Sequence, residues 1–327
     1  MISNKAVKQL GAEELKYAVG PLLYCPADND RIFDNLLNGK LGHINTLVMC
    51  LEDAILPQKV TEATEVLLNT FNKFEKMDAK SKEQLPLLFI RVRNPYHLEE
   101  VFSKFGGFKT LTGFVLPKYD MSVNKEYAKI IHRIQSSRLR REKYYFMPIL
   151  ESDSIMGADR RNQLQMIAES LDDIDSILNI LVGSNDMCRH FMIRRSASQT
   201  IYDVGVVRDI LIDIIATFTP KYVVNGPVWE YFDGDEWEQG LLMETELDKL
   251  NGFIGKACIH WKQVELLHSA MKVNKNDWED AVDLTNWNEA RGVKKSRVSG
   301  RMNELATNLS WAERIITLGK IYGVNED

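Results

Sequence analysis

Short apolar runs alternate along the chain with longer segments in which apolar and charged residues recur at helical spacing. The apolar runs span residues 22–25, 46–51, 87–92, 113–116, 145–150, 180–182, 222–224 and 257–259. Between them the pattern predicts amphipathic helices at 58–76, 125–138, 160–171, 202–218 and 240–250. Strands that alternate with crossover helices form parallel sheets. The sequence therefore predicts an α/β protein, a (β/α)8 barrel; the competing open sheet lacks its glycine-rich phosphate-binding motif.

The pattern changes after residue 260, where helical periodicity takes over at 264–271, 278–292 and 305–318. A barrel does not need these extra helices to close. We therefore expect a barrel domain at 1–265 and a C-terminal helical segment at 266–327. Within that segment, residues 292–302 are basic and bounded by glycines, as a mobile lid or a subunit contact would be.

Composition narrows the class of protein. Of the 327 residues, 27% are charged and 45% are hydrophobic, which is ordinary for a globular protein. A formal net charge of −5 argues against binding to nucleic acid or to a membrane surface, because both require a concentrated positive field. The chain has no apolar stretch typical of a signal peptide or a membrane span, and its four cysteines have no zinc-type spacing. We expect a cytoplasmic protein.

Polar or turn-forming residues follow the apolar runs at the points where the strands should end, and in such a barrel the active site lies at these ends. In strand order they are Pro26, Glu52 with Asp53, Arg91 with Arg93, Lys118, Glu151, Ser184 with Asp186, Asn225 and His260. Glu151 and Asp186 follow neighbouring strands and carry the oxygen ligands that Mg²⁺ prefers. They are the predicted metal pair.

Several motifs along the chain resemble those of one family. They are L-E-D-A-I at 51–55, I-R-V at 90–92, L-P-K at 116–118, E-S-D-S-I-M-G at 151–157, G-F-I-G-K-A-C-I-H-W-K-Q at 252–263 and G-R-M at 300–302. Their order and spacing resemble the citrate lyase β-subunit-like family, within the HpcH/HpaI aldolase superfamily. More narrowly, the chain is similar to a divergent branch of predicted carbon–carbon lyases found beside tellurium-resistance genes.

The resemblance implies a role for each candidate residue. Mg²⁺ on Glu151 and Asp186 would bind a 2-oxo acid or a carboxylate-bearing thioester and stabilise an enolate. The implied catalytic residues are Arg91 as a clamp for the carboxylate or the enolate oxygen, Glu52 or Asp53 as the general base, and Lys118. The implied substrate contacts are Pro26, Ser184, Asn225 and Arg301.

The implied function is a Mg²⁺-dependent carbon–carbon lyase acting on an acyl-coenzyme A or a related 2-oxo or 3-hydroxy acid. The sequence departs from the family at Ala27 and Asn29, where the first loop usually reads P-G-x-R, and at Ser299, where the lid usually carries an aspartate. These departures leave open a coenzyme A-independent 2-oxo acid aldolase, and also an altered barrel that acts as a binding or scaffold component. Family members assemble as homotrimers or hexamers, so we expect an oligomer.

Simpler structural roles remain for several of these residues. Asp53 could cap the helix that follows it. Arg91 or Arg93 could pair with Glu52 across the barrel mouth, and Lys118 could neutralise buried acids. His260 is expected to be structural, because no second histidine is placed to share a metal.

Overall fold

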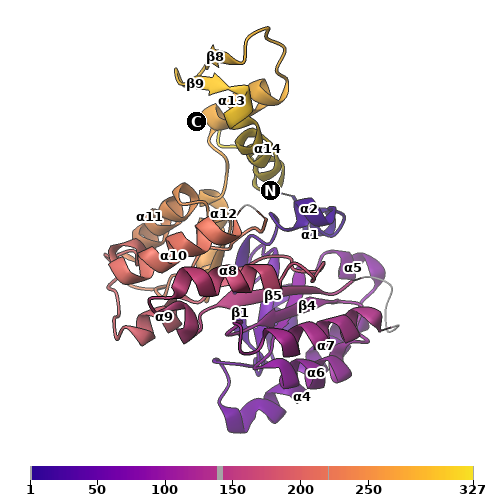
Figure 1. Ribbon diagram of the computed structural model, residues 1–327. Helices are drawn as coiled ribbons and strands as arrows, with labels where there is room; N and C mark the ends of the chain where they lie inside the picture. Colours follow the sequence, from indigo (N-terminus) through magenta and orange to yellow (C-terminus); the bar gives the residue numbers. More distant parts are fainter. Residues whose placement is uncertain (1, 138–142, 220, 327) are drawn as a thin grey trace.

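A curled parallel sheet forms the centre of the computed structural model, which describes residues 2–137, 143–219 and 221–326 (Figure 1). Its strands stand in the order β6-β5-β4-β3-β2-β1-β7, and each pairs in parallel with its neighbour. They are β1 (Pro21–Pro26), β2 (Thr46–Cys50), β3 (Leu87–Arg91), β4 (Leu111–Leu116), β5 (Tyr145–Leu150), β6 (Leu181–Val182) and β7 (Lys256–Cys258). The predicted barrel architecture is confirmed.

The seventh predicted strand, at 222–224, is wrong in detail, because these residues form no regular strand. The segment still closes the ring, through isolated parallel bridges from Val224 to Ile180 and from Gly226 to Lys256. Pro227 follows at once and has no N–H to donate, so a longer ladder cannot form there. The barrel thus has seven regular strands and one irregular segment.

Helices connect the strands and cover the outside of the sheet (Figure 1). The longer ones are α4 (Val60–Glu75), α6 (Pro95–Phe105), α7 (Asn124–Ser136), α8 (Arg160–Ser170), α10 (Gly205–Phe218), α11 (Trp237–Leu250) and α12 (Lys262–Ala270). The shorter ones are α1 (Asn4–Val7), α2 (Ala12–Leu15), α3 (Ile32–Leu37), α5 (Ala79–Glu83), α9 (Ser184–His190) and the 3₁₀ turns η1 (Pro57–Lys59), η2 (Asp153–Ile155) and η3 (Ile201–Asp203). The five helices predicted between strands appear as α4, α7, α8, α10 and α11; the expected last residue of the second, 138, lies outside the described residues.

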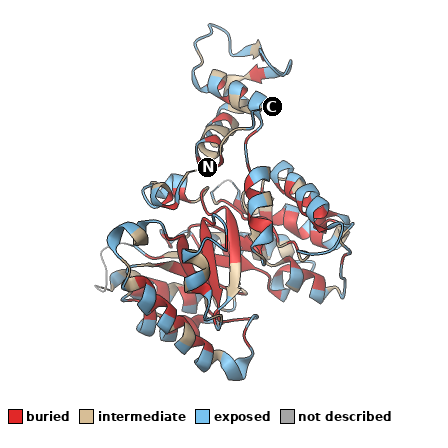
Figure 2. Cartoon of the chain, turned by 180° about the vertical axis from the view of Figure 1, so that it is seen from behind, coloured by how far each residue is buried: buried red, intermediate tan, exposed pale blue. Residues whose placement is uncertain are grey.

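Burial follows the apolar runs of the sequence. Figure 2 shows the strands as the buried centre of the molecule, and all five residues of β2 are buried. Gly113 in β4 allows its neighbour β5 to approach closely, since a Cβ there would lie 1.8 Å from the Tyr145 carbonyl oxygen. Local signals fix helix starts in the same way: the Asn94 side chain accepts the His97 N–H at the start of α6, and Pro95 holds the first helical position.

The C-terminal residues form a projecting unit, which we call the arm (Figure 1). It comprises α13 (Lys275–Thr285), an antiparallel hairpin of β8 (Val293–Lys295) and β9 (Met302–Glu304), and α14 (Leu305–Tyr322). The basic stretch at 292–302 is therefore a hairpin. A small separate core of Ala281, Leu284 and Ala312 holds the arm together.

The arm joins the barrel at the end of the sheet where the strands begin. At the base of α14, the Tyr322 hydroxyl donates to the Tyr17 carbonyl oxygen, 2.7 Å away, and lies close to Gly20, just before β1. The carboxyl ends of the strands lie at the opposite end of the barrel. None of the described helices is long and apolar enough to cross a membrane.

Candidate active site

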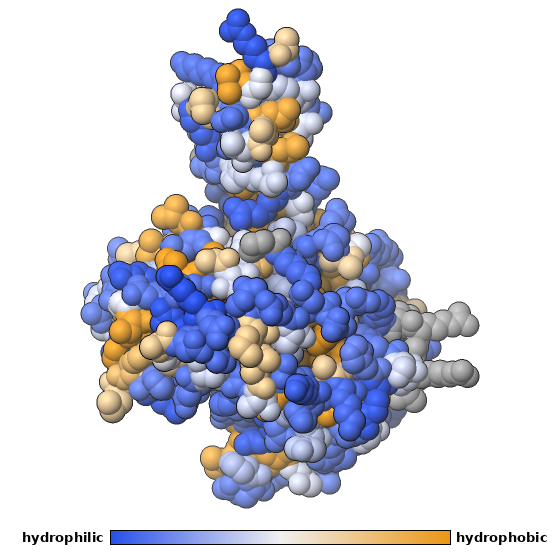
Figure 3. Space-filling view, in the orientation of Figure 1, coloured by the Kyte–Doolittle hydropathy of each residue, from blue (hydrophilic) through white to orange (hydrophobic). Residues whose placement is uncertain are grey.

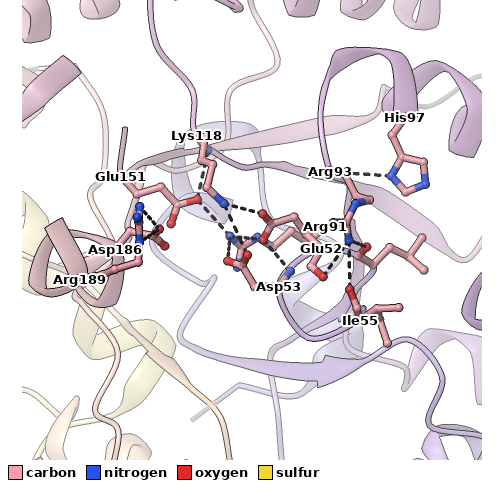
Figure 4. A network of polar contacts seen from close by, with 11 residues as sticks. Glu52, Asp53, Ile55, Arg91, Arg93, His97, Lys118, Glu151, Asp186 and Arg189 are labelled. Atoms are coloured by element: carbon pink, nitrogen blue, oxygen red, sulfur yellow. Dashed lines mark hydrogen bonds and ion pairs between the residues drawn. The ribbon is translucent and has the colours of Figure 1, made fainter. Parts of the chain in front are cut away.

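The carboxyl ends of four consecutive strands bring five of the predicted residues together (Figure 4). Because β2, β3, β4 and β5 are in parallel register, their last residues meet at one edge of the sheet. Glu52 and Asp53 follow β2, Arg91 ends β3, Lys118 follows β4 and Glu151 follows β5. The sequence folds this way because each apolar run is followed at once by a polar residue.

A cavity of about 390 Å³ opens at this edge. Its charged wall consists of Asp53, Arg91, Glu151 and Asp186. Its apolar wall consists of Ile149, Leu181, Val182, Val228, Ala257 and Ile259. A molecule with a charged head and an apolar body would match both walls.

Arg91 is the centre of the charged wall. Its Nη2 atom lies 2.7 Å from Glu52 Oε2, 3.1 Å from Asp53 Oδ2 and 3.1 Å from Glu151 Oε1. Burial lowers the pKa of Arg91, but Glu151 and the other nearby acids outweigh burial, so the pKa is raised overall. Arg91 is therefore a permanent cation whose position is fixed by three carboxylates.

Arg93 has a structural role instead. Its Nη1 atom donates to the backbone carbonyl oxygens of Leu51, Glu52 and Ile55, at 3.0 to 3.2 Å. These bonds hold the loop after β2, which carries Glu52 and Asp53. Of the two arginines that sequence reasoning left open, Arg91 is the one that lines the cavity.

Glu151 is the most deeply buried acid of the cluster, with 3% of its surface exposed. Burial and, to a lesser extent, the charge of Asp186 raise its pKa to about 7, against the opposing effect of Arg91. Its Oε1 atom accepts the Lys118 N–H at 3.1 Å. On the other side its carboxylate lies against Gly183, where an added Cβ would stand 2.0 Å from Oε2. Only glycine leaves room for the carboxylate there.

Lys118 adopts a left-handed backbone with a φ of 50°, which is uncommon for a residue with a side chain. The conformation lets one residue serve two acids: its N–H reaches Glu151, and its Nζ lies 2.6 Å from Glu52 Oε1. Lys118 Nζ is also 3.5 Å from Asp53 Oδ1. The lysine therefore neutralises and positions the acids, and it does not itself line the cavity.

The two acids after β2 differ in environment. Burial raises the pKa of Glu52, whose side chain is 7% exposed and bound to both Arg91 and Lys118. Burial acts in the same direction on Asp53, but a hydrogen bond with Glu52 and the charge of Arg91 outweigh it and lower the Asp53 pKa. Asp53 is 55% exposed and lines the cavity, so it is the acid that a ligand can reach.

Asp186 comes from the first turn of α9, after β6. Its side chain is 17% exposed, and its Oδ1 atom lies 3.1 Å from Arg189 Nη2 on the solvent side (Figure 4). Its charge acts on Glu151 across the cavity. The predicted metal pair is therefore brought to one cavity.

The remaining predicted contacts are placed differently. Pro26 lines the cavity, whereas the fully buried Ser184 and the buried Asn225 do not; their neighbours Asn185 and Gly226 do. The Ser184 hydroxyl and both amide atoms of Asn225 find no hydrogen-bond partner in the described part of the chain.

Arg301 lies far from this cavity, in the arm. It binds Asp277 and Asp280 at 2.7 and 2.9 Å and stacks over Trp311. No residue of the arm lines the cavity of its own chain, since the arm is attached at the other end of the barrel.

The prediction from the sequence left out several lining residues, among them Tyr24, Gly183 and Asn185. Tyr24 in β1 lies with its ring centroid 5.9 Å from Arg91 Cζ. Its position two residues before Pro26 places both on the same face of the strand, a signal that could have identified it. No comparable signal in the sequence marked Gly183 and Asn185, because their place in the cavity wall depends on contacts that form only in the folded protein.

The charge balance tests whether a metal ion fits. The cluster holds four acids and three cations, namely Glu52, Asp53, Glu151 and Asp186 with Arg91, Lys118 and Arg189. The acids are in excess, and an anionic substrate would add to that excess. Across the described ranges no group of three or more histidines, cysteines and acids is arranged to hold a metal. Two carboxylates with open positions suit Mg²⁺, which keeps several waters.

Comparison with known proteins places the chain in a family. Residues 13–324 match the model of a family described as C-C bond lyase of the TIM-barrel fold. No curated protein matches the chain.

Solved structures with a similar fold include CitE from Mycobacterium tuberculosis in complex with magnesium, acetoacetate and coenzyme A. It has a TM-score of 0.64 and 18% identity, covering 94% of this chain and 100% of that one. A citrate lyase from Burkholderia xenovorans has a TM-score of 0.69 and 12% identity, covering 94% and 93%. At these identities the likeness concerns the fold.

Proposed function

The chain belongs to the C-C bond lyase family of the TIM-barrel fold, and we propose that it cleaves or forms a carbon–carbon bond beside a carboxylate or thioester carbonyl, with Mg²⁺ held by Glu151 and Asp186. The observation that carries the proposal is the buried Glu151, which faces Asp186 across a cavity and lies against Arg91. The CitE structure is in complex with magnesium and acetoacetate, among other ligands, which supports Mg²⁺ and a small carboxylate as the ligands of this site.

When bound, Mg²⁺ supplies a Lewis acid for the negative charge that develops as the carbon–carbon bond breaks. Arg91 binds the substrate carboxylate or carbonyl oxygen, because it is the buried cation on the cavity wall. Glu52, Asp53 and Glu151 hold its guanidinium in place before substrate arrives.

Asp53 accepts the proton of the substrate hydroxyl. It is the acid after β2 that lines the cavity, and its lowered pKa keeps it ionised at neutral pH. As the proton moves to Asp53, the electron pair of the broken bond stays on the carbon beside the carbonyl. Glu52, bound to Arg91 and Lys118, keeps both cations oriented.

Calorimetric titration of Mg²⁺, with and without oxaloacetate, tests the proposal. We expect substrate to tighten metal binding to the wild-type protein, and Asp186→Ala to abolish that binding. Asp209→Ala is the matched control, because Asp209 is an exposed acid on α10 that pairs with Arg208. Absence of Mg²⁺ binding under both conditions would refute the lyase and favour the scaffold alternative.

A coenzyme A-independent aldolase is the second candidate. Ser299 stands where the family lid carries an acid, and its hydroxyl donates to Asp280 within the arm at 2.8 Å. Titration with acetyl-coenzyme A against pyruvate would separate the two activities by which compound binds.

We also propose that the enzyme is cytoplasmic and that it assembles as a homotrimer or hexamer. Figure 3 shows apolar patches on the arm, where Val293 and Met302 are 48% and 65% exposed. Since the arm cannot reach its own cavity, Arg301 would contact substrate only in a neighbouring subunit. Light scattering that found only monomer would refute this assembly.

A further inference from the structure

Three partly exposed rings lie on the two segments that continue from the apolar wall of the cavity. The Phe232 and His260 rings stack with centroids 4.6 Å apart and planes inclined by 13°, and the Trp261 centroid lies 5.4 Å from that of His260. Phe232 is 39% exposed and Trp261 is 42% exposed. We call these three residues the aromatic ledge.

The ledge is continuous with the apolar wall of the cavity. Ile259, which directly precedes His260, lines the cavity and is 43% exposed. Val228 lines the same wall from the segment that leads to Phe232. The ledge therefore directly follows Ile259 along the chain and lies next to the apolar wall.

Gln263 holds the two halves of the ledge together. This buried side chain accepts the N–H groups of Ile259 and His260 at 2.9 and 3.2 Å. It donates to the carbonyl oxygens of Trp229 and Tyr231 at 3.0 and 2.9 Å. The ledge is thus fixed in place by hydrogen bonds before any ligand binds, which reduces the entropy that binding would cost.

His260 is uncharged in this arrangement. Its Nδ1 atom accepts the Lys262 N–H at 3.3 Å, so that nitrogen carries no proton. Burial lowers its pKa, and the charge of Lys262 lowers it further. A neutral ring stacked on Phe232 offers an apolar aromatic surface.

The charges around the ledge select against phosphates. The loop that carries Phe232 continues with the exposed acids Asp233, Asp235 and Glu236. Lys262 Nζ lies 3.8 Å from Asp233, so this cation is already paired. A coenzyme A molecule with its base on the ledge would bring its phosphates beside these acids, which like-charge repulsion disfavours.

We propose that the aromatic ledge binds an uncharged aromatic ring carried by the substrate itself, while the substrate carboxylate occupies the charged wall. The inference rests on the proposed function for the carboxylate end and adds the chemical class of the other end. The substrate is thus an aryl or heteroaryl 2-oxo or 3-hydroxy acid without phosphate groups.

Calorimetry in the presence of Mg²⁺ with three acids and coenzyme A tests the ledge. Phenylpyruvate and 2-oxo-4-phenylbutanoate provide a ring at two distances from the carboxylate, and pyruvate provides none. We expect at least one aryl acid to bind about tenfold more tightly than pyruvate, the gain typical of a stacking contact. Coenzyme A should not compete with it.

Trp261→Ala and Phe232→Ala should each remove most of that gain and leave the affinity for pyruvate unchanged. Leu250→Ala is the matched control, since Leu250 is 81% exposed but ends α11, at the other end of the barrel. All three positions are exposed, so the variants should fold.

The outcomes separate the two proposals. Failure of pyruvate to bind, with tight aryl binding that Trp261→Ala weakens, would refute the proposed carboxylate site and retain the ledge. Equal affinity for aryl acids and pyruvate would overturn the ledge, as would no binding by any acid. Coenzyme A binding that Trp261→Ala weakens would overturn the uncharged ring and assign the ledge to a nucleotide base.

Discussion

Replacing Gly183 by alanine places a methyl group against the proposed metal ligand Glu151. The added Cβ would lie 2.0 Å from Glu151 Oε2 and 2.5 Å from Glu151 Cβ. Non-bonded atoms prefer about 3.5 Å, so the carboxylate must move by about 1.5 Å. Rotation of the side chain cannot relieve the contact with Glu151 Cβ, which is fixed by β5. The backbones of β5 and β6 must therefore also move apart at this point, where the Gly183 N–H donates to the Leu150 carbonyl oxygen at 3.2 Å.

The expected cost follows from these distances. Overpacking of this kind lowers the free energy of unfolding by about 1–3 kcal/mol. Displacement of a metal ligand or its support lowers metal affinity by about 10–100-fold. We therefore expect Gly183→Ala to lose at least tenfold in Mg²⁺ affinity while remaining folded.

Calorimetric titration of Mg²⁺ and thermal unfolding of the same samples measure both effects. Gly157→Ala is the matched control, because Gly157 follows the same strand and an added Cβ there meets nothing within 4 Å. Wild-type Mg²⁺ affinity in Gly183→Ala would refute the assignment of Glu151 as a ligand held by Gly183. An equal loss in Gly157→Ala would show that the loop is merely sensitive to substitution.

Two further predictions concern stability. Lys256→Met should lower the free energy of unfolding, measured in urea, by about 3–5 kcal/mol, because it removes the cation that the buried Glu244 and Asp248 share. The control variant Lys262→Met, at the surface, should change the free energy of unfolding little. An equal effect of the two substitutions would contradict the prediction. Burial lowers the pKa of His268 to about 4, so the fold favours its neutral form, and stability is complete above pH 6.5 and falls as the pH drops towards 4. The free energy of unfolding, measured in urea at pH 7 and at pH 4, should fall by about 3 kcal/mol less in His268→Gln than in the wild-type protein. An unchanged pH dependence would refute the attribution of this loss to His268.

The sequence correctly predicted which residues meet where the backbone geometry of the barrel alone brings them together. Parallel strands gather their carboxyl ends, so polar residues after each apolar run had to meet, and Asp53, Arg91, Glu151 and Asp186 do line one cavity. It was misleading where the chain leaves the strand. Each helical step turns a side chain by about 100°, so after β6 Asn185 and Asp186 face the cavity and Ser184 does not.

Long-range contacts account for the rest. The position of the arm depends on the contact between Tyr322 and Tyr17, which are 305 residues apart, and no local pattern predicts such a contact. The basic segment with Arg301 could therefore be recognised as unusual, but its attachment opposite the cavity could not be inferred. The missing seventh strand had a local cause that was visible in advance, the proline at position 227.

Two buried charge networks in this barrel have opposite characters, and the difference indicates which one does chemistry. The network between α11 and β7 has two acids and two cations, Glu244 and Asp248 with Arg195 and Lys256, and their side chains are at most 2% exposed. It is neutral and shut off from solvent, as a structural network should be. The network at the strand ends has more acids than cations and opens into a cavity. An unbalanced charge that a ligand can reach costs stability unless a cation or a substrate balances it. This difference supports our proposal that catalysis takes place at this end of the barrel.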